Sequence, residues 1–380
     1  MGAQSSIADV IVIGAGTVGA AIAYGLARKG LRVTVLDGPD TDFRAARANF
    51  GLVWVQGKGQ GKQQPMPAYQ ALSRRSSDLW PGFNAELTDL VGHDLGYERN
   101  GGLAFCLGEA ELATRRAALQ RLHNALGGDA DWEMLDRPAL EKLLPRIRLG
   151  PDVTGASFGR SDGHVNPLRL LAALHEALLR LGGALHAGHA VRKITGGSGG
   201  VRVETDAGCH AAARLVIAAG LGSAELARQV DLTIPLRPQR GQILVTERFA
   251  PFLPLPASGV RQTREGTVMI GATQEEVGFD TSTTVAAAAK LSARALRIVP
   301  ALKSARIVRH WAGLRVMTPD SYPVYAQSTT RPGAFVALCH SGVTLAALHA
   351  TVIADAVAAG SLPASLAMFH QGRFDVPQAA

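Results

Sequence analysis

The sequence predicts an α/β fold in which a parallel sheet is combined with a second domain built on an antiparallel sheet. Two short apolar runs, 10–13 and 33–36, enclose the glycine-rich turn Gly14-Ala15-Gly16-Thr17-Val18-Gly19. This is the strand–turn–helix–strand order of a dinucleotide-binding unit. Strand–turn–helix patterns recur at 215–226 and 335–358, and strands of different character lie between them. The order therefore predicts a Rossmann-like domain interleaved with the second domain.

Each glycine of the first turn has a physical role. Gly14 permits the tight turn, Gly16 lets a pyrophosphate approach the backbone, and Gly19 lets the helix pack closely on the strand. Asp37 follows the second apolar run, 18 positions after Gly19, where an acidic side chain accepts hydrogen bonds from a ribose. A plain turn in a protein core explains the apolar runs but not three glycines and an acid together. We therefore expect a bound dinucleotide.

Composition limits the classes of function. The chain has 380 residues, which favours two domains, and its 47% hydrophobic and 18% charged residues are typical of a globular protein. The net charge is +8, but the basic residues are scattered and aromatic residues make up only 5%. We expect no nucleic-acid surface, because basic and aromatic residues do not interleave. A diffuse positive field is compatible with an anionic substrate or an acidic partner.

The cysteines and the termini bear on location. Cys106, Cys209 and Cys339 lie far apart and form no CxxC, so we expect reduced thiols, no metal site and a cytoplasmic protein. The first strand begins too early for a signal peptide, and charged and histidine residues interrupt the apolar stretch 334–360. A peripheral position at the inner face of the membrane stays open.

The remaining elements follow from periodicity and capping signals. In the first half we expect a loop over 43–61 with an apolar island at 52–55, helices over 69–90, 109–126 and 137–144, and strands over 103–107 and 132–135. In the second half Asn166-Pro167 starts a helix that continues over 168–181. Further strands are expected over 184–186, 191–194, 201–205, 214–218, 242–246, 268–271 and 335–338, and helices over 284–299 and 344–358. The dinucleotide-binding domain is expected to comprise 1–60, 150–235 and 311–380, and the substrate-binding domain 61–149 and 236–310.

An ordered set of motifs extends over nearly the whole chain. After the fingerprint and Asp37 come Asn49-Phe50-Gly51, His-Val-Asn-Pro at 164–167, Val-Ile-Ala-Ala-Gly at 216–220, Pro-Gln-Arg-Gly-Gln at 238–242, Gly-Ala-Thr-Gln-Glu at 271–275, Trp-Ala-Gly-Leu-Arg at 311–315 with Thr-Pro-Asp at 318–320, and His-Ser-Gly-Val-Thr-Leu-Ala at 340–346. In this order they resemble the FAD-dependent D-amino-acid oxidase superfamily, which includes glycine and sarcosine oxidases. The last motif and the Arg-Gly-Gln motif are most similar to the group that comprises the hydrogen cyanide synthase flavoprotein (its C subunit), D-hydroxyproline dehydrogenase and the B subunits of opine oxidases.

The resemblance implies an FAD cofactor and the residues that hold it. The family places the Asn49 loop beside the flavin ring and holds the adenine with backbone groups near Val191, which is otherwise a plain strand residue. Ala219 and Gly220 suit a backbone close to the dinucleotide, or an ordinary turn. The residues expected to bind FAD are Gly14, Gly16, Thr17, Val18, Gly19, Asp37, Asn49, Gly51, Leu52, Val191, Ala219, Gly220, Gly313, Gly342, Val343 and Thr344.

Arg315 is the residue that we expect to bind the substrate. It lies in a mostly apolar segment, where an arginine needs a partner because an unpaired buried charge is costly. Its planar fork matches a carboxylate. The family uses the arginine of the same Gly-Leu-Arg motif for the amino-acid carboxylate. The alternative is a structural ion pair with a residue such as Asp320.

The motif that starts at His340 is expected at the reduced flavin. Its free amides and the following helix N-terminus would stabilise negative charge at the flavin N1 and O2 atoms. Ser341 or Thr344 is alternatively a helix cap. His340 contacts substrate or flavin, or is structural, and we assign it no acid or base role.

Two departures from the family pattern matter. Monomeric sarcosine oxidases carry a cysteine for a covalent flavin bond near this arginine, whereas residues 314–317 read Leu-Arg-Val-Met, so a non-covalent FAD is expected. Phe50 replaces a small residue, which narrows the space near the ring and weakens the inference for that loop.

The expected activity is oxidation of a D-amino acid or secondary amino acid, proline-, hydroxyproline- or opine-like, to the imine by hydride transfer to flavin N5. Orientation supplies most of the catalysis. We expect a dehydrogenase that passes electrons to a quinone or a partner subunit, in a homo- or hetero-oligomer. The alternatives are a glycine- or sarcosine-type oxidase that reduces oxygen to hydrogen peroxide, a non-catalytic FAD-carrying subunit, and a nicotinamide-dependent enzyme.

Overall fold

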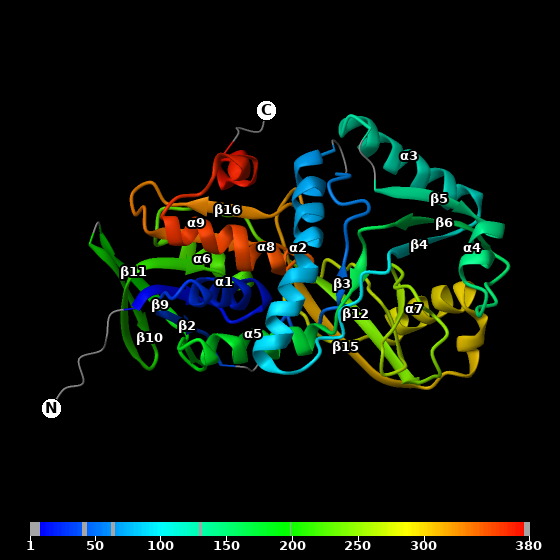
Figure 1. Cartoon of the computed structure of the whole chain (residues 1–380), viewed down its shortest axis with the longest axis horizontal. Helices are drawn as coiled ribbons and strands as arrows, with labels where there is room; N and C mark the ends of the chain where they lie inside the picture. The colour runs from blue at the N-terminus through cyan, green and yellow to red at the C-terminus, as the bar shows by residue number, and fades with distance from the viewer. Residues whose placement is uncertain (1–7, 40–43, 62–64, 129–130, 198, 376–380) are drawn as a thin grey trace.

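The computed structural model describes residues 8–375 apart from 40–43, 62–64, 129–130 and 198. The predicted fold class is confirmed. One half of the molecule is built on an eight-stranded, largely parallel sheet, and the other half on antiparallel sheets (Figure 1). Both halves are made of segments that are far apart in the sequence.

The large sheet has the order β16-β17-β11-β1-β2-β8, with the hairpin β9–β10 paired to β11. Pairings among β17, β11, β1, β2 and β8 are parallel, and β16 is antiparallel to β17. The strands are β1 (Ala8–Ile13), β2 (Val33–Leu36), β8 (Ala184–His186), β9 (Val191–Gly197), β10 (Gly200–Thr205), β11 (Gly208–Ile217), β16 (Val324–Gln327) and β17 (Ala334–Leu338). The central strands are buried and consist almost entirely of Val, Ile, Leu and Ala, as a parallel sheet covered on both faces requires.

Helix α1 (Thr17–Arg28) lies between the sheet, α5 (Pro167–Arg180) and the last helix. A Cβ on Gly25 would overlap the carbonyl oxygen of Ala350, so this glycine permits the close helix crossing. The last helix was expected over 344–358. It begins at α8 (Ala346–Leu348) and continues through a π-helical turn, η3 (His349–Ile353), into α9 (Ala354–Ala359).

The second half contains a four-stranded and a three-stranded antiparallel sheet. Apolar side chains from both sheets and from α7 pack into one core between them. The strands are β13 (Val260–Gln262), β14 (Thr267–Gly271), β12 (Arg237–Arg248) and β15 (Ile307–Met317), then β4 (Gly102–Leu107), β6 (Val153–Gly159) and β5 (Trp132–Asp136); the helices are α3 (Glu109–Ala125), α4 (Arg137–Leu143) and α7 (Val285–Ile298).

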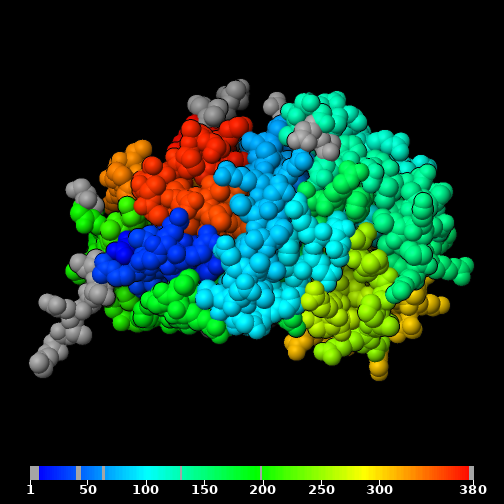
Figure 2. Space-filling view, in the orientation of Figure 1, coloured from blue at the N-terminus to red at the C-terminus, as the bar shows by residue number. Residues whose placement is uncertain are grey.

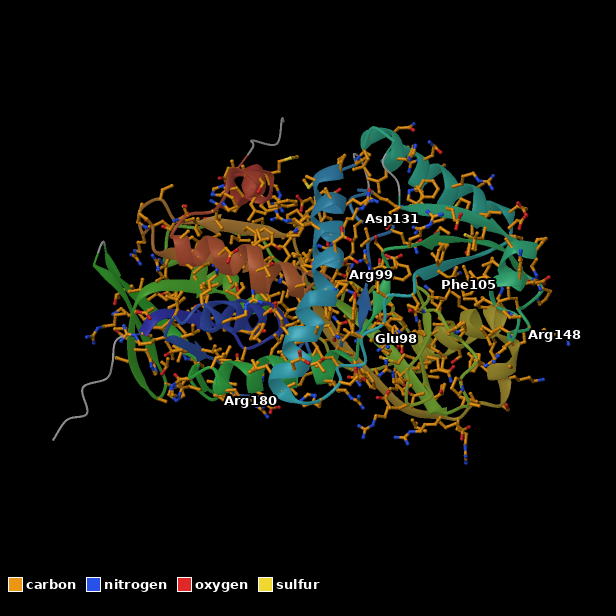
Figure 3. The ribbon with its side chains drawn as sticks, viewed as in Figure 1. Glu98, Arg99, Phe105, Asp131, Arg148 and Arg180 are labelled. Atoms are coloured by element: carbon orange, nitrogen blue, oxygen red, sulfur yellow. The ribbon has the colours of Figure 1, made fainter. Side chains whose placement is uncertain are left out.

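Helix α2 (Pro67–Val91) crosses the front of the molecule between the two halves (Figures 1 and 2). The two-residue strands β3 (Leu52–Val53) and β7 (Gly163–His164) pair with each other, and β3 lies beside α2 in Figure 1. Glu98 and Arg99, labelled in Figure 3, lie at this junction. The Glu98 N–H donates to the His164 carbonyl at 2.9 Å, and the Arg99 guanidinium pairs with Asp78 of α2 at 2.6 Å.

The predicted domain boundaries remain a prediction. The expected boundary at 311 falls within β15, and the expected segment 150–235 begins with β6; both strands pair in the antiparallel sheets. Strands β3, β6, β7, β13, β15 and β16 were not predicted, whereas helix α6 (Ser223–Arg228) lies at the end of the strand–turn–helix pattern expected over 215–226. Within the described ranges no single helix is long and apolar enough to cross a membrane, although the segments Ala346–Ala359 and Ala364–Phe374, bent by 110°, meet the length and composition criteria as a pair.

Candidate active site

Four parallel strands end at the same edge of the large sheet. Gly14 follows β1, Asp37 follows β2, Ala218 follows β11, and Cys339 follows β17. A cavity of about 1310 Å³ lies along this edge and extends to β12 and β15 of the antiparallel sheet. Ligands of open α/β sheets bind at the carboxyl ends of the strands, so this cavity is the candidate site.

The structure brings the predicted site residues together. All the residues expected to hold the dinucleotide line the cavity except Gly19 and Gly51, and Arg315 and His340 line it too. Their roles toward a cofactor remain predictions.

The three glycines of the fingerprint have different surroundings. Gly14 has φ of +104°, and a Cβ there would overlap the carbonyl oxygen of Ala218. A Cβ on Gly19 would overlap the carbonyl oxygen of Gly14, so Gly19 lets the helix pack closely on the strand, as expected. Gly19 does not line the cavity. At Gly16 the nearest atom to a Cβ is the methyl carbon of Ala46, 3.8 Å away. Gly16 is therefore open to the cavity, which fits the approach of a pyrophosphate.

The N-terminus of α1 also fits an anionic group. The first-turn N–H groups of a helix have no intrahelical acceptor, and α1 has neither a side-chain cap nor an acidic residue in its first turn. The hydroxyl of Thr17 is buried, lines the cavity and has no hydrogen-bond partner among the described residues. A buried hydroxyl normally has a partner. A phosphate oxygen would satisfy both this hydroxyl and the free N–H groups.

Asp37 and Val191 lie at the end of the cavity near β2 and β9. One carboxylate oxygen of Asp37 accepts from the Gly38 N–H at 3.0 Å, and the other forms an ion pair with Arg44. Arg44 also lines the cavity and donates to the Pro39 carbonyl at 2.7 Å. The carboxylate is thus held in place beside the cavity, where a ribose would need it.

Contacts within the protein fix the conformation of the Asn49 loop. The Asn49 side-chain oxygen accepts from the Gly51 N–H at 2.7 Å. Gly51 has φ of +83°, and a Cβ there would overlap the carbonyl oxygen of Val165. Gly51 therefore shapes the turn rather than lining the cavity, whereas Asn49 and Leu52 do line it. Phe50 lies in the lining as expected, with the Arg261 guanidinium 5.7 Å from its ring centre.

The loop after β17 packs against the fingerprint. A Cβ on Gly342 would lie 3.3 Å from a methyl of Val18. The Thr344 hydroxyl accepts from the Trp54 N–H at 3.1 Å and donates to the Leu52 carbonyl at 3.3 Å. Neither Ser341 nor Thr344 caps the helix, which begins without a side-chain cap, so the capping alternative is wrong. Within the described part of the chain, the amides at 342–344 donate to no protein acceptor.

Arg315 lies on β15, directly opposite Gln239 of β12. Its guanidinium packs over Gly241, where a Cβ would lie 2.7–2.8 Å from the guanidinium atoms. It makes two long hydrogen bonds of 3.4 Å, to the Gln239 side chain and to the Arg240 carbonyl. Burial lowers the pKa of Arg315. The alternative of an ion pair with Asp320 is wrong, because Asp320 pairs with Arg373 at 2.7 Å.

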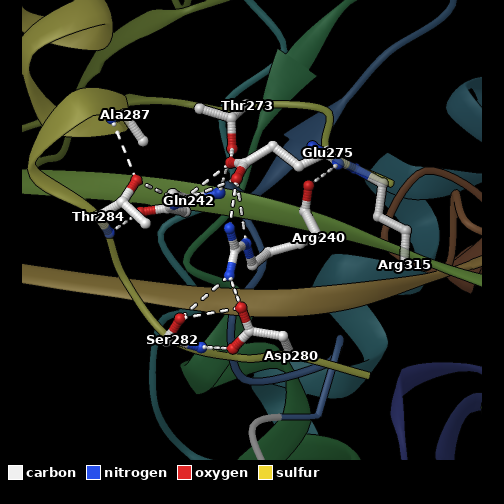
Figure 4. Close-up of polar contacts among 9 residues, drawn as sticks. All are labelled: Arg240, Gln242, Thr273, Glu275, Asp280, Ser282, Thr284, Ala287 and Arg315. Atoms are coloured by element: carbon white, nitrogen blue, oxygen red, sulfur yellow. Dashed lines mark hydrogen bonds and ion pairs between the residues drawn. The ribbon is translucent and has the colours of Figure 1, made fainter. Parts of the chain in front are cut away.

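Glu275, the carboxylate that acts electrostatically on Arg315, is already paired with other side chains. Figure 4 shows Glu275 held by Arg240, Gln242 and Thr273. The Arg240 side chain is 5% exposed and pairs with Glu275 at 2.6 Å and also with Asp280. Glu275 therefore satisfies Arg240, and among the described residues Arg315 has no carboxylate at hydrogen-bond distance.

Lys58 is a lining residue that sequence reasoning missed. It lies in the glycine-rich loop after β3, and its ammonium donates to the Ser341 hydroxyl at 2.6 Å. Burial, with Arg315 adding to the effect, lowers the pKa of Lys58 to about 8. A single lysine among glycines carries no signal in the sequence; only the fold brings it to the loop after β17.

His340 completes this end of the cavity. Burial and the charges of Lys58 and Arg315 hold the pKa of His340 well below its usual value. The imidazole is therefore neutral near pH 7. Both cations act on it electrostatically, so Lys58, Arg315 and His340 form one group, the cationic end of the cavity.

Comparison with known proteins identifies the family. The model of the family described as FAD dependent oxidoreductase matches residues 9–356. The chain belongs to this family. The B subunit of opine oxidase from Agrobacterium tumefaciens (strain Ach5) is 43% identical over 373 residues, covering 98% of this chain and 99% of that protein. The HcnC subunit of hydrogen cyanide synthase from Pseudomonas aeruginosa is 30% identical, and the matched region covers 98% of this chain and 97% of HcnC.

A solved structure agrees in fold over nearly the whole chain. Glycine oxidase from Geobacillus kaustophilus superposes with a TM-score of 0.87 at 27% identity, covering 97% of this chain and 99% of that one. The predicted superfamily and FAD cofactor are thereby confirmed, and the nicotinamide alternative is wrong. The chain is an FAD-dependent oxidoreductase, which takes electrons from a small molecule and passes them to an acceptor.

Proposed function

We propose that the chain is an FAD-dependent dehydrogenase that oxidises the C–N bond of an amino acid or secondary amine beside a carboxylate, with an opine-like secondary amine as the preferred donor. One observation carries the proposal. Arg315 presents a half-buried guanidinium to the cavity without a carboxylate partner among the described residues. A substrate carboxylate supplies that partner. The relatives named as B subunits of opine oxidases support the opine-like class.

The cofactor would be held along the strand edge. Gly16, Thr17 and the first turn of α1 would hold the pyrophosphate, Asp37 the ribose and the backbone at Val191 the adenine. The free amides at 342–344 would face the polar edge of the flavin. The cysteine of the lining, Cys339, has its pKa raised to about 12 by burial, so it stays a thiol. This supports a non-covalent cofactor.

The bound flavin supplies the two-electron oxidation by accepting a hydride from the carbon next to nitrogen. The protein contributes orientation: Arg315 binds the carboxylate as a fork and thereby fixes the C–H bond. The positive charges of Arg315 and Lys58 disfavour a protonated amine, so the substrate binds with a free lone pair. The neutral His340 adds no charge. No general base is needed, and water hydrolyses the imine after release.

The electron acceptor is proposed to be a partner subunit or a quinone. Two relatives are named as single subunits of larger enzymes, which supports a multi-subunit enzyme. A glycine oxidase-type reaction is the second candidate, because the glycine oxidase fold superposes over the full chain. Hydrogen peroxide production separates the two candidates.

The test is an anaerobic titration of the purified flavoprotein. We expect bleaching of the flavin spectrum by an opine, less by sarcosine, glycine or D-proline, and slow recovery in air. Fast recovery with stoichiometric peroxide would support the oxidase candidate. A spectrum that no amine bleaches would contradict the proposal and favour a non-catalytic FAD-carrying subunit.

A further inference from the structure

The cationic end of the cavity contains more positive charge than one carboxylate requires. Lys58 and Arg315 both line the cavity, and their charges lower the pKa of the same His340 imidazole. Arg315 also lowers the pKa of Lys58, so the two cations repel each other in a partly dehydrated space. Repulsion of this kind is costly unless an anion lies between or beside the charges.

The protein does not provide that anion among its described residues. The Lys58 ammonium has one hydrogen bond, to the neutral Ser341 hydroxyl, and lies 5.6 Å from the Tyr69 ring centre. The carboxyl group nearest in electrostatic effect is Asp162, which is fully buried and accepts from the Val55 N–H at 2.5 Å and the Gln56 side chain at 2.6 Å. Desolvation raises the pKa of Asp162 to about 7. Its charge is therefore weakened and its hydrogen bonds are directed elsewhere.

Ser341 leaves two of the three ammonium donors unused. The same hydroxyl is also at 2.6 Å from the Tyr69 hydroxyl, which fixes the position of Ser341. An ammonium has three donors, so Lys58 has two available for a ligand in the cavity. Within the described residues Arg315 likewise makes two long hydrogen bonds, and most of its donors are available.

We propose that Lys58 and Arg315 each bind one carboxylate of the same substrate, an N-(1-carboxyalkyl) amino acid whose secondary amine has a carboxylate on both sides. This inference rests on the proposed function and adds to it the residue, Lys58, that distinguishes an opine-like donor from an amine with a single carboxylate. With both carboxylates bound, the amine is held between two fixed points, and the C–H bond on one side is selected for oxidation.

The reaction balances without a further reactant. The α-carbon loses a hydride to the flavin and the nitrogen loses a proton to water, which leaves a C=N bond. Water then adds to that carbon and the C–N bond breaks, giving a 2-oxo acid and a free amino acid. Each product retains one of the two carboxylates.

The test compares two pairs of ligands that differ by one carboxylate, with the flavin-loaded enzyme. Thiodiglycolate and (methylthio)acetate cannot form an imine and report binding through the flavin difference spectrum. Iminodiacetate and sarcosine report reduction of the flavin under anaerobic conditions. We expect wild-type protein to bind thiodiglycolate on the order of 100-fold more tightly than (methylthio)acetate, the range of a hydrogen bond between charged groups.

Substitution of Lys58 isolates its contribution. In Lys58→Met the preference for thiodiglycolate over (methylthio)acetate should fall to about threefold or less. The Kd of (methylthio)acetate itself should change less than about threefold. Lys58→Arg should retain most of the preference, and Lys290→Met, at an exposed lysine of α7, should retain all of it. If Lys58→Met loses its flavin, Lys58→Gln keeps a donor to Ser341 and replaces it in the comparison.

The outcomes separate the two proposals. An unchanged preference in Lys58→Met, or an equal loss of affinity for both ligands, would overturn the role of Lys58. Reduction by sarcosine as efficient as by iminodiacetate would overturn the dicarboxylate class while leaving amine oxidation intact. A preference for thiodiglycolate without reduction by any amine would overturn the proposed function and leave the carboxylate pair standing.

Discussion

The two ends of the cavity recognise their ligands in different ways. The end near α1 is made mainly of backbone: Gly14, which has no room for a side chain, Gly16, which is open to the cavity, and free N–H groups, with the Asp37 carboxylate beside them. The opposite end is made of side chains: the charged Lys58 and Arg315, with the neutral His340 between their fields. Backbone recognition suits a cofactor that never changes, whereas side chains on separate elements allow the substrate to change without loss of the cofactor.

The largest effect is expected from a substitution that disrupts the backbone end of the cavity. Gly14→Val places a branched side chain at a φ of +104° against the Ala218 carbonyl, so we expect a loss of roughly 3 kcal/mol or more of stability, and of bound flavin. Gly16→Val is the matched variant, since the nearest atom is 3.8 Å away. Its apoprotein should melt like wild type while its FAD affinity falls on the order of 100-fold. Calorimetry and flavin content measure both, and normal flavin content in Gly16→Val would contradict the placement of the pyrophosphate.

An effect limited to the substrate, with fold and cofactor retained, is expected from breaking the charged end. Arg315→Ala removes the partner of a substrate carboxylate. The ratio of the rate constant of flavin reduction to the Kd of the substrate should fall on the order of 1000-fold, and the flavin spectrum should stay unchanged. Arg309→Ala, at an exposed arginine of the same strand, is the control and should behave like wild type. Stopped-flow reduction by an opine makes the measurement. An intact rate in Arg315→Ala would remove the observation on which the proposed function rests.

Gly241 tests whether the charged end also depends on backbone shape. A Cβ at this position would lie 2.7 Å from Arg315 Nη2, so Gly241→Ala should displace the guanidinium and lower kcat/KM about 10- to 100-fold, with FAD affinity retained. In a double-mutant cycle, Gly241→Ala should cost little once Arg315 is alanine. Additive losses in that cycle would indicate a structural role for Gly241 that is independent of Arg315.

The smallest effect is a pH dependence confined to the charged end. The pKa of Lys58 is lowered to about 8, so the ammonium loses its proton above that pH and the affinity for thiodiglycolate should fall about tenfold per pH unit. Below pH 8 the ammonium is protonated and the affinity should level off, apart from the titration of Asp162 near pH 7. The neighbouring Cys339 titrates near 12, and Tyr69 and His340 titrate outside the range. Lys58→Arg should abolish the fall between pH 8 and 10, and a fall that persists would assign it to another group.

The difference between a site built from one local segment and a site built from distant segments also explains which parts of the fold the sequence predicts. The first β-α-β unit was predicted nearly residue by residue, because its glycines, apolar runs and acid lie within forty positions. The strands that were missed are short, such as β7 and β13, or have an apolar sequence that is interrupted by arginine, histidine and glycine, such as β15. Their strand conformation depends on pairing with distant segments, for which a local pattern has no signal.

The candidate site shows the same limit. Arg315 was found because an arginine in an apolar run is unusual in any single sequence window. Lys58 was missed because its surroundings are created by a contact across 283 positions, with Ser341. Gly241 was noticed only as part of a motif, and its purpose became clear from the guanidinium that packs over it.

The order of strands in the large sheet has a consequence for biosynthesis. β1 is translated well before its partners: it pairs with β11 and lies two places from β17, which ends at Leu338. The loop that follows β17 also fastens the segment at Leu52 through Thr344. The cofactor cavity therefore closes only after translation has passed Thr344. We expect cofactor loading to be a late, post-translational event, and folding to be slow because the decisive contacts are remote in sequence.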